Sequence, residues 1–399
     1  MTVNLLHKFV KHTKVAITEN LSMKNVVIFQ FTLLKFLGLS PHVFTGGKYR
    51  RNYVYVGMSV AMQFIVSAWN IADSGPLPNF KIPDFRAIYF FTWITCSNIM
   101  KFITRWSLVL YSRQFVDILR FIYGRKRSSS FTKNVLCSIT MMFFISVCVT
   151  INTYNTNKTH KNWAVYISKI MLGIGLSLTT PTLCLTLYQL MRLIASDLKL
   201  CSQQITSAIR MTGVQQKPVT LTNETSTITL TKCKQECSHI HEAVGKIQTV
   251  FASTAFALLA FEQIEIMIVG LYPMISNSFH FLKLLPVILM GSLQVWLVID
   301  SQSSYIEECE ESVNRLKKLI ATVGERETVR NKIVWKLRGI QAELERMPRF
   351  TMFGLFELGR HCLLSMVSVV LTYVIIAIQF NTSNSPITCK PFNCNCTMC

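Results

Sequence analysis

The stretch LLSMVSVVLTYVIIAIQF, residues 363–380, decides how the chain is interpreted. It is 18 residues long and carries no charge, which is enough to cross a membrane as a helix. Its polar residues are Ser365, Ser368, Thr372 and Gln379. At about 100° per residue these fall within one stripe of roughly 60°, and Ile376 lies near the edge of that stripe. Aligned polar groups in a membrane need another helix or water beside them.

The rest of the chain has the same apolar character. Of its 399 residues 50% are hydrophobic and 15% charged, whereas soluble proteins carry about a quarter charged residues. We predict membrane-spanning helices near 53–72, 87–111, 135–153, 163–191, 249–274, 284–302 and 363–380. The segment 26–39 contains Lys35 and is too short to span, so we expect it to lie along the membrane or to pack beneath it. The predicted fold class is all-α, a seven-transmembrane helical membrane protein.

Basic residues set the predicted orientation. The segments 1–52, 112–134, 192–248 and 303–362 hold 31 Lys and Arg residues when Arg360 is left out, against 6 in the opposite set of loops. Cytoplasmic loops carry the excess of Lys and Arg, so the amino terminus is predicted inside and the carboxyl terminus outside. This asymmetry also explains the net charge of +21 without any nucleic acid partner. G-protein-coupled receptors have the opposite orientation, and the sequence lacks their Asp-Arg-Tyr and Asn-Pro-x-x-Tyr motifs.

We divide the chain by these features. The divisions are a cytoplasmic amino-terminal segment 1–52, a six-helix membrane domain 53–302, cytoplasmic anchor helices 303–362, the last span 363–380 and an extracellular tail 381–399. The stretch 305–347 mixes Glu with Lys and Arg around apolar residues at helical spacing, with an interruption near Gly324 and an end at Pro348. The tail holds Cys389, Cys394, Cys396 and Cys399. These cysteines either form disulfides outside the cell or lie in a disordered tail.

Two interpretations of the polar stripe remain open at this point. In the first, small polar residues form hydrogen bonds to another helix within one subunit. In the second, the same helix from several identical subunits surrounds a water-filled pore. A single narrow stripe cannot enclose a conduit, but several copies around a symmetry axis can. Because the stripe is uncharged, selectivity would then depend on diameter, dipoles and neighbouring acidic residues.

The sequence resembles the insect gustatory receptor family. TYVIIAIQF, 372–380, has the family's Thr-Tyr, five hydrophobic residues and Gln-Phe. FLGLSPHVF, 36–44, looks like the family's stretch before the first span, and FGLFELGRHCLLSMVSVVLTYVIIAIQF, 353–380, is similar to its last helix and cytoplasmic approach. The resemblance implies a tetrameric, ligand-gated, nonselective cation channel in the plasma membrane of sensory neurons. Subunits would be identical or mixed with other gustatory receptors, and cytoplasmic helices would hold them together.

The resemblance also implies roles for individual residues. Gln379 and Phe380 would sit at or near the gate, while Thr372 and Tyr373 would pack or form hydrogen bonds within and between pore helices. Phe380 lies about 100° from Gln379 around the helix. Phe380 therefore gates only if the helix rotates between closed and open states.

The family keeps its ligand pocket in the outer half of each subunit, among the second to sixth spans. Candidate residues there are Tyr89, Trp93, Asn152, Trp163, Tyr166, Glu262, Glu265, Tyr272, Gln294 and Trp296. Aromatic faces with a few polar groups suit a small organic tastant, although aromatic residues also populate membrane interfaces. Intramembrane carboxylates such as Glu262 and Glu265 need protein or water partners. Lys101 and Arg105, at the inner end of the second span, are expected to reach the headgroups.

The identity of the tastant rests on one position. Many sugar receptors of the family have an acidic residue after the Tyr of the motif, and this chain has Val374. Bitter plant compounds are therefore favoured, with a fructose-like sugar second. A membrane carrier with mid-membrane sites is the alternative to a channel.

One further group of residues has metal-ligating chemistry. Cys233, Cys237 and His241 recur at i, i+4 and i+8 on one helical face, which fits either a zinc site or ordinary packing of reduced thiols. We expect packing, no metal and no cofactor. The sequence has no phosphate-binding glycine loop, zinc-protease helix or hydrolase serine elbow, so no enzyme is predicted.

Overall fold

The computed structural model describes residues 42–45, 48–73, 85–123, 163–214, 219–275, 281–324 and 331–383. These residues form eight helices and two short antiparallel hairpins. The helices are α3 (Tyr53–Asp73), α4 (Phe85–Leu110), α5 (Ser112–Tyr123), α7 (Trp163–Val214), α8 (Val219–Ile275), α9 (Phe281–Gly324), α10 (Asn331–Glu345) and α11 (Arg360–Ser383). The strands are β1 (His42–Thr45), β2 (Lys48–Arg51), β3 (Thr351–Met352) and β4 (Phe356–Glu357).

Six of the seven predicted spans coincide with helices, namely α3, α4, α11 and the outer parts of α7, α8 and α9. The predicted span 135–153 and the segment 26–39 lie outside the described residues. Among the described residues, the helical stretch Thr227–Ile264 is long and apolar enough to cross a membrane, and Tyr53–Ile65 and Arg360–Ile376 are shorter apolar helices. The helical fold class is confirmed. The two hairpins were not predicted.

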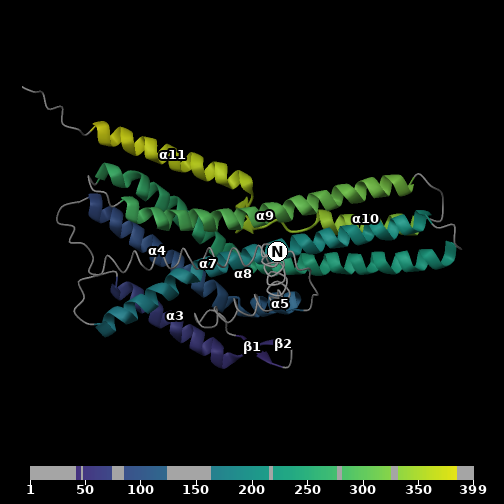
Figure 1. Cartoon of the computed structure of the whole chain (residues 1–399), viewed down its shortest axis with the longest axis horizontal. Coiled ribbons are helices and arrows are strands. Elements are labelled where there is room, and N and C mark those ends of the chain that lie inside the picture. Colours follow the sequence, from purple (N-terminus) through teal and green to yellow (C-terminus); the bar gives the residue numbers. More distant parts are fainter. Residues whose placement is uncertain are drawn as a thin grey trace, which may run out of the picture.

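Three helices continue far beyond their spans. Helices α7, α8 and α9 have 52, 57 and 44 residues, and at 1.5 Å per residue α8 is about 85 Å long. Figure 1 shows α7, α8, α9 and α10 running together to one end of the molecule, while α3, α4 and α11 lie at the other end. The predicted boundary between residues 302 and 303 therefore falls inside a continuous helix, and no linker separates the two regions.

We call the four-helix extension the anchor bundle: residues 192–214 of α7, 219–248 of α8, 303–324 of α9, and α10. Each helix presents a buried seam with alternating spacings of three and four residues. In α8 the seam is Leu230, Cys233, Cys237, Ile240, Val244 and Ile247, and in α10 it is Ile333, Leu337, Ile340 and Leu344. All of these belong to one continuous core cluster. Such seams are typical of helices packed side by side in bundles.

Local sequence signals explain several helix ends. Asn52 caps α3, because its Oδ1 accepts a hydrogen bond from the Val54 amide at 2.9 Å. Helix α10 ends at Glu345, shortly before Pro348, as predicted. The Tyr305 hydroxyl of α9 donates to the Pro348 carbonyl at 3.1 Å. This bond fixes the chain where it leaves the anchor bundle.

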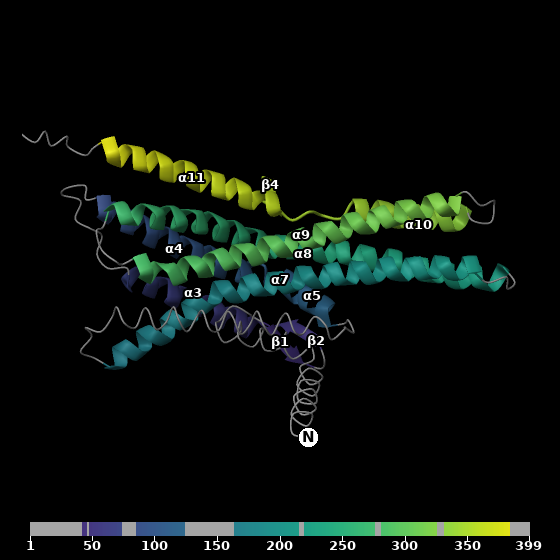
Figure 2. The ribbon, with the colours of Figure 1, turned by 45° about the horizontal axis from the view of Figure 1, so that its top comes forward.

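The chain then passes through the β3–β4 hairpin into α11. Thr351 pairs with Glu357 and Met352 with Phe356. Phe350, Met352 and Leu358 are fully buried in the main core, so the base of the hairpin is packed into that core. Helix α11 packs against α8 and α9 and lies along the margin of the molecule in both views (Figure 2).

Candidate pore helix and ligand region

One face of α11 packs against its own subunit. The half-buried residues along the helix are Leu363, Met366, Val370 and Val374, and Leu363 and Met366 contact the main core. Their spacings of three and four residues place them on one side of the helix. This side accounts for the contacts of α11 with α8 and α9.

The predicted stripe lies on the other side. The side chains of Ser365, Ser368, Thr372, Ile376 and Gln379 are exposed, as is Tyr373. At about 100° per residue, the stripe is roughly opposite the packed face. The Phe380 side chain lies outside the described part of the chain. The structure therefore turns these polar groups away from the rest of the subunit.

The hydroxyl groups on this face are bonded within the helix. Ser365 Oγ donates to the His361 carbonyl at 3.2 Å, and Thr372 Oγ1 donates to the Ser368 carbonyl at 2.8 Å. Each bond runs to a residue four positions earlier on α11 itself. Hydrogen bonding of these two hydroxyls to another helix of the same subunit, the first interpretation of the stripe, gains no support from this geometry.

Glu262 is the best defined of the ligand candidates. It is buried on α8, and its Oε1 accepts a hydrogen bond from Ser292 Oγ of α9 at 3.0 Å. Its carboxylate lies against Gly291, where a Cβ atom would overlap the carboxylate oxygens. Glycine at 291 therefore lets the carboxylate enter the contact between the two helices. A buried carboxylate needs such partners, since desolvation without them is costly.

Gln294 and Trp296 do not share a face. Gln294 is buried and lies 3.8 Å from the Cys184 thiol of α7, whereas Trp296 is exposed. Two residues along a helix correspond to about 200° of rotation, so the two side chains point in nearly opposite directions. The side chains of Tyr89, Trp93, Trp163, Tyr166, Glu265 and Tyr272, and the whole of Asn152, lie outside the described part of the chain.

The expectation that Arg105 reaches the headgroups is wrong. Its side chain is buried, and its Nη1 lies 3.5 Å from Gln63 Oε1 of α3. The long side chain thus connects α3 and α4 inside the membrane domain. Sequence reasoning missed this contact because Gln63 lies 42 residues away. The side chain of Lys101 is outside the described part of the chain.

The cysteines of α8 pack in the anchor bundle. Cys233 and Cys237 are buried on the seam of α8, and Cys201 of α7 lies opposite, with its Sγ 3.9 Å from Cys237 Sγ. The hydrogen bond with Cys201 and burial raise the pKa of the Cys233 thiol. Zinc binds the thiolate, which this environment disfavours. Among the described residues, no group of three or more Cys, His, Asp or Glu side chains is arranged to hold a metal ion.

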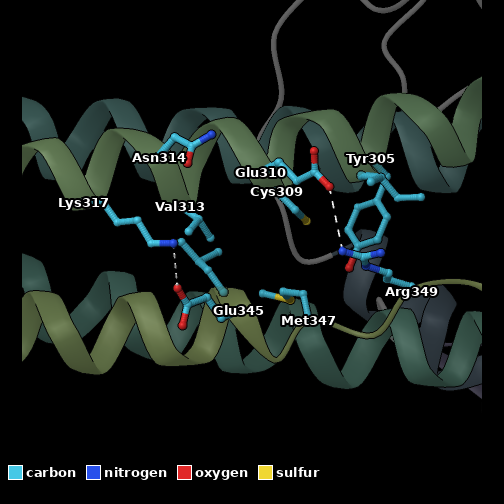
Figure 3. Close-up of a pocket in the computed structure, with 11 residues that line it drawn as sticks. Tyr305, Cys309, Glu310, Val313, Asn314, Lys317, Glu345, Met347 and Arg349 are labelled. Atoms are coloured by element: carbon cyan, nitrogen blue, oxygen red, sulfur yellow. Dashed lines mark ion pairs between the residues drawn. The ribbon is translucent and has the colours of Figure 1, made fainter.

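A groove of about 320 Å³ lies between α9 and the chain around the end of α10. Figure 3 shows two ion pairs across it, Lys317 with Glu345 at 3.3 Å and Arg349 with Glu310 at 3.8 Å. Tyr305 and Met347, both buried, line the space between. Burial raises the pKa of the Tyr305 hydroxyl. The groove is thus part of the packing between α9 and α10, and sequence reasoning did not identify it.

Comparisons with known proteins find one family model that matches this chain and solved structures with a similar fold. A family model described as 7tm chemosensory receptor matches residues 28–384. The insect olfactory receptor OR5 from Machilis hrabei in complex with eugenol is similar in structure, with a TM-score of 0.67 and 12% identity over 90% of this chain and 98% of that chain. A second structure of the same receptor has a TM-score of 0.66 and 13% identity over 90% of this chain and 98% of that chain. No curated protein sequence matches.

Proposed function

Because the chain belongs to the 7tm chemosensory receptor family, whose members are membrane receptors rather than enzymes, we propose that it is a gustatory receptor that acts as a ligand-gated, nonselective cation channel. Four subunits surround the pore, either four copies of this chain or a mixture with other gustatory receptors. The channel works in the plasma membrane of sensory neuron dendrites. Its amino terminus is cytoplasmic, as the distribution of Lys and Arg predicts.

The position of the polar stripe on α11 carries this proposal. Ser368, Thr372 and Gln379 are exposed on the side of α11 away from its own subunit. Aligned polar groups on a membrane helix are typically turned toward protein or water rather than lipid, and a central pore supplies water on this side of α11. Four copies of α11 then form the wall of the pore, and Gln379 and Phe380 form the constriction near its outer end.

The ligand is a small organic tastant bound in the outer half of the membrane domain. A related fold exists in complex with eugenol, which supports a small aromatic or similarly apolar compound. Val374 favours bitter plant compounds over sugars by the family resemblance, and fructose is the second possibility. Glu262 is less available to a ligand than the sequence suggests, because Ser292 and Gly291 already surround its carboxylate.

Two neighbouring residues provide a matched test. Thr372 and Leu371 are both exposed, but Thr372 lies inside the stripe and Leu371 lies about 100° from it around α11. The chain is expressed alone, and calcium imaging with bitter alkaloids and D-fructose first identifies an activating compound. A membrane-impermeant cationic thiol reagent is then applied to Thr372→Cys and Leu371→Cys channels in the open state, with the parent chain as the baseline for its 13 native cysteines.

We expect the reagent to block the current through Thr372→Cys channels and to leave Leu371→Cys channels like the parent. Equal modification of both variants, or of neither, would contradict a pore lined by this stripe. Saturable uptake of a compound without ligand-evoked current would favour a carrier. An amino-terminal tag that is accessible on intact cells would favour the G-protein-coupled orientation.

A further inference from the structure

The turn between β3 and β4 together with the first residue of β4, residues 353–356, exposes a group of large apolar side chains that we call the hairpin tip. Phe353, Leu355 and Phe356 are exposed by 61%, 73% and 42%. Phe353 and Gly354 have φ values of 52° and 73°, in the left-handed region that a non-glycine residue rarely adopts. A backbone held in this conformation indicates that the surroundings fix the turn.

The base of the hairpin is fixed to the anchor side of the molecule. Phe350, Met352 and Leu358 are buried in the core. Gln248 of α8 donates through Nε2 to the Thr351 carbonyl at 3.2 Å and to Thr351 Oγ1 at 2.6 Å. Gln248 is the residue before the predicted span 249–274. The start of β3 therefore lies at the predicted edge of the membrane.

The tip points from this edge toward the membrane. The ring of Phe353 packs edge-on against Phe256 of α8, with 5.5 Å between the ring centroids. Phe256 is eight residues beyond Gln248, which corresponds to about 12 Å along α8. Phe256 itself lies within the predicted span and is partly exposed. The hairpin thus rises along α8 from the level of Gln248 into the apolar layer.

Charged residues are confined to the other end of the hairpin. Arg349 pairs with Glu357 at 3.0 Å, and Arg360 pairs with Glu307 of α9 at 2.7 Å. Glu307 is five residues past the predicted end of the span 284–302, on the anchor side. The hairpin therefore has a charged base and an apolar tip along the same axis that leads from the anchor bundle into the membrane.

From this arrangement we propose that the hairpin tip inserts into the edge of the hydrocarbon layer, in the leaflet next to the anchor bundle, and holds the start of α11 at a fixed depth. Apolar and aromatic side chains are stable at this interface. The chain enters α11 three residues after β4, so a tip held by lipid restrains the point about which α11 moves. The proposal depends on membrane insertion of the family fold and not on the pore assignment.

Brominated lipids provide the test, since they quench tryptophan fluorescence on contact. The full-length Leu355→Trp variant is reconstituted in phosphatidylcholine vesicles with plain or brominated acyl chains, and the signal of the parent, which has six tryptophans, is subtracted. We expect most of the added fluorescence to be lost in brominated lipid. Ile228→Trp, an exposed apolar position on the anchor part of α8, is the matched control and should keep its added fluorescence.

A Phe356→Trp variant retains an aromatic ring at the tip and repeats the measurement if Leu355→Trp does not fold. Added fluorescence at 355 or 356 that brominated lipid leaves unchanged would overturn the proposal. So would a photoreactive benzophenone side chain at 355 that crosslinks to a second copy of the chain instead of to lipid. None of these measurements needs a tastant or a current, so a failed pore assignment would not be mistaken for a failed tip assignment.

Discussion

Helices α10 and α11 follow one another in the chain but have opposite relations to their surroundings. Helix α10, NKIVWKLRGIQAELE, carries many charges, yet the four apolar residues of its seam are buried. Helix α11 has no charge between residues 362 and 383, yet most of its described side chains there are exposed. The more apolar helix is thus the less buried one.

This difference shows what each helix needs. The buried seam of α10 faces α8 and α9, and its charged face suits water, so one subunit satisfies the whole helix. Helix α11 has only a narrow face against its own subunit. Its apolar remainder suits lipid or further protein, and its polar stripe faces away from its own subunit. A single copy therefore covers the seam of α10 and leaves most of the described surface of α11 exposed.

The test of this contrast with the largest expected effect compares the removal of a buried and of an exposed aliphatic side chain. Ile340→Ala on α10 removes a fully buried side chain from the core and should lower the free energy of unfolding by about 2–4 kcal/mol. Leu371→Ala on α11 removes a side chain that is 55% exposed and should cost about 1 kcal/mol or less. The apparent Tm, measured by size-exclusion after heating in detergent, ranks the two variants.

Trp335→Ala supplies the control within α10, because this side chain is exposed and its loss should leave Tm nearly unchanged. A Tm for Leu371→Ala as low as that for Ile340→Ala would break the contrast. It would mean that α11 contributes to the stability of the isolated subunit as much as the anchor bundle does.

The second test asks whether packing between spans is as specific as packing in the anchor bundle. A methyl group at Gly291 would overlap the Glu262 carboxylate, so Gly291→Ala should lower the free energy of unfolding by about 1–3 kcal/mol. In a chain that already carries Glu262→Ala, the same change should cost much less, because the overlap is gone. The two single variants and the double variant form a thermodynamic cycle measured by Tm.

Gly245→Ala is the matched control on α8. Among the described residues outside its own turn of helix, no atom lies within 4 Å of the position that a Cβ would take there, and alanine favours the helix over glycine by up to about 1 kcal/mol. Its Tm should therefore stay constant or rise. If Gly291→Ala and Glu262→Ala lowered the free energy of unfolding additively, the Glu262 carboxylate would not occupy the space beside Gly291.

Sequence patterns predicted the helices well because long apolar runs and helical spacing are local properties. The run 363–380 lies within α11, and the interruption near Gly324 coincides with the end of α9. The spacing of Cys233, Cys237 and His241 was equally recognisable in the sequence, where it fitted either packing, which we expected, or a metal site. Only the position of Cys201 on α7 shows that these thiols face another helix.

The missed features all depend on residues far apart in the chain. Arg105 meets Gln63, and Glu262 meets Gly291, and neither pair leaves a periodic trace in the sequence. The β3–β4 hairpin has strands of two residues, too short for an alternating pattern to indicate it. The stripe on α11 was predictable, whereas its direction, away from the subunit, required the packed face to be known.

The smallest expected effect concerns two glutamates of the anchor bundle with opposite pKa shifts. Desolvation raises the pKa of Glu308 above its usual 4.5, although Arg315 and Lys199 act in the other direction. Hydrogen bonds from Gln341 and Lys317 lower the pKa of Glu345. The folded state therefore favours the protonated form of Glu308 and the ionised form of Glu345.

The two shifts predict opposite pH dependence. The contribution of Glu308 to the free energy of unfolding is fully present below its pKa in the unfolded chain and is lost as pH rises through its pKa in the folded chain. At neutral pH the ionised Glu308 is therefore unfavourable, and Glu308→Gln should stabilise the protein by less than about 1 kcal/mol. Stability from Glu345 is present above its unfolded pKa and is lost as pH falls through its folded pKa, so Glu345→Gln should lower Tm at neutral pH. Glu308→Gln should approach the parent near pH 4, where Glu308 is largely protonated, whereas Glu345→Gln should approach the parent only below the lowered pKa of Glu345. Tm is measured for the parent and both variants from pH 4 to 8. A Tm of Glu308→Gln below that of the parent at pH 7 would show that the attraction of the Glu308 carboxylate to Arg315, 3.8 Å away, outweighs the cost of burying it.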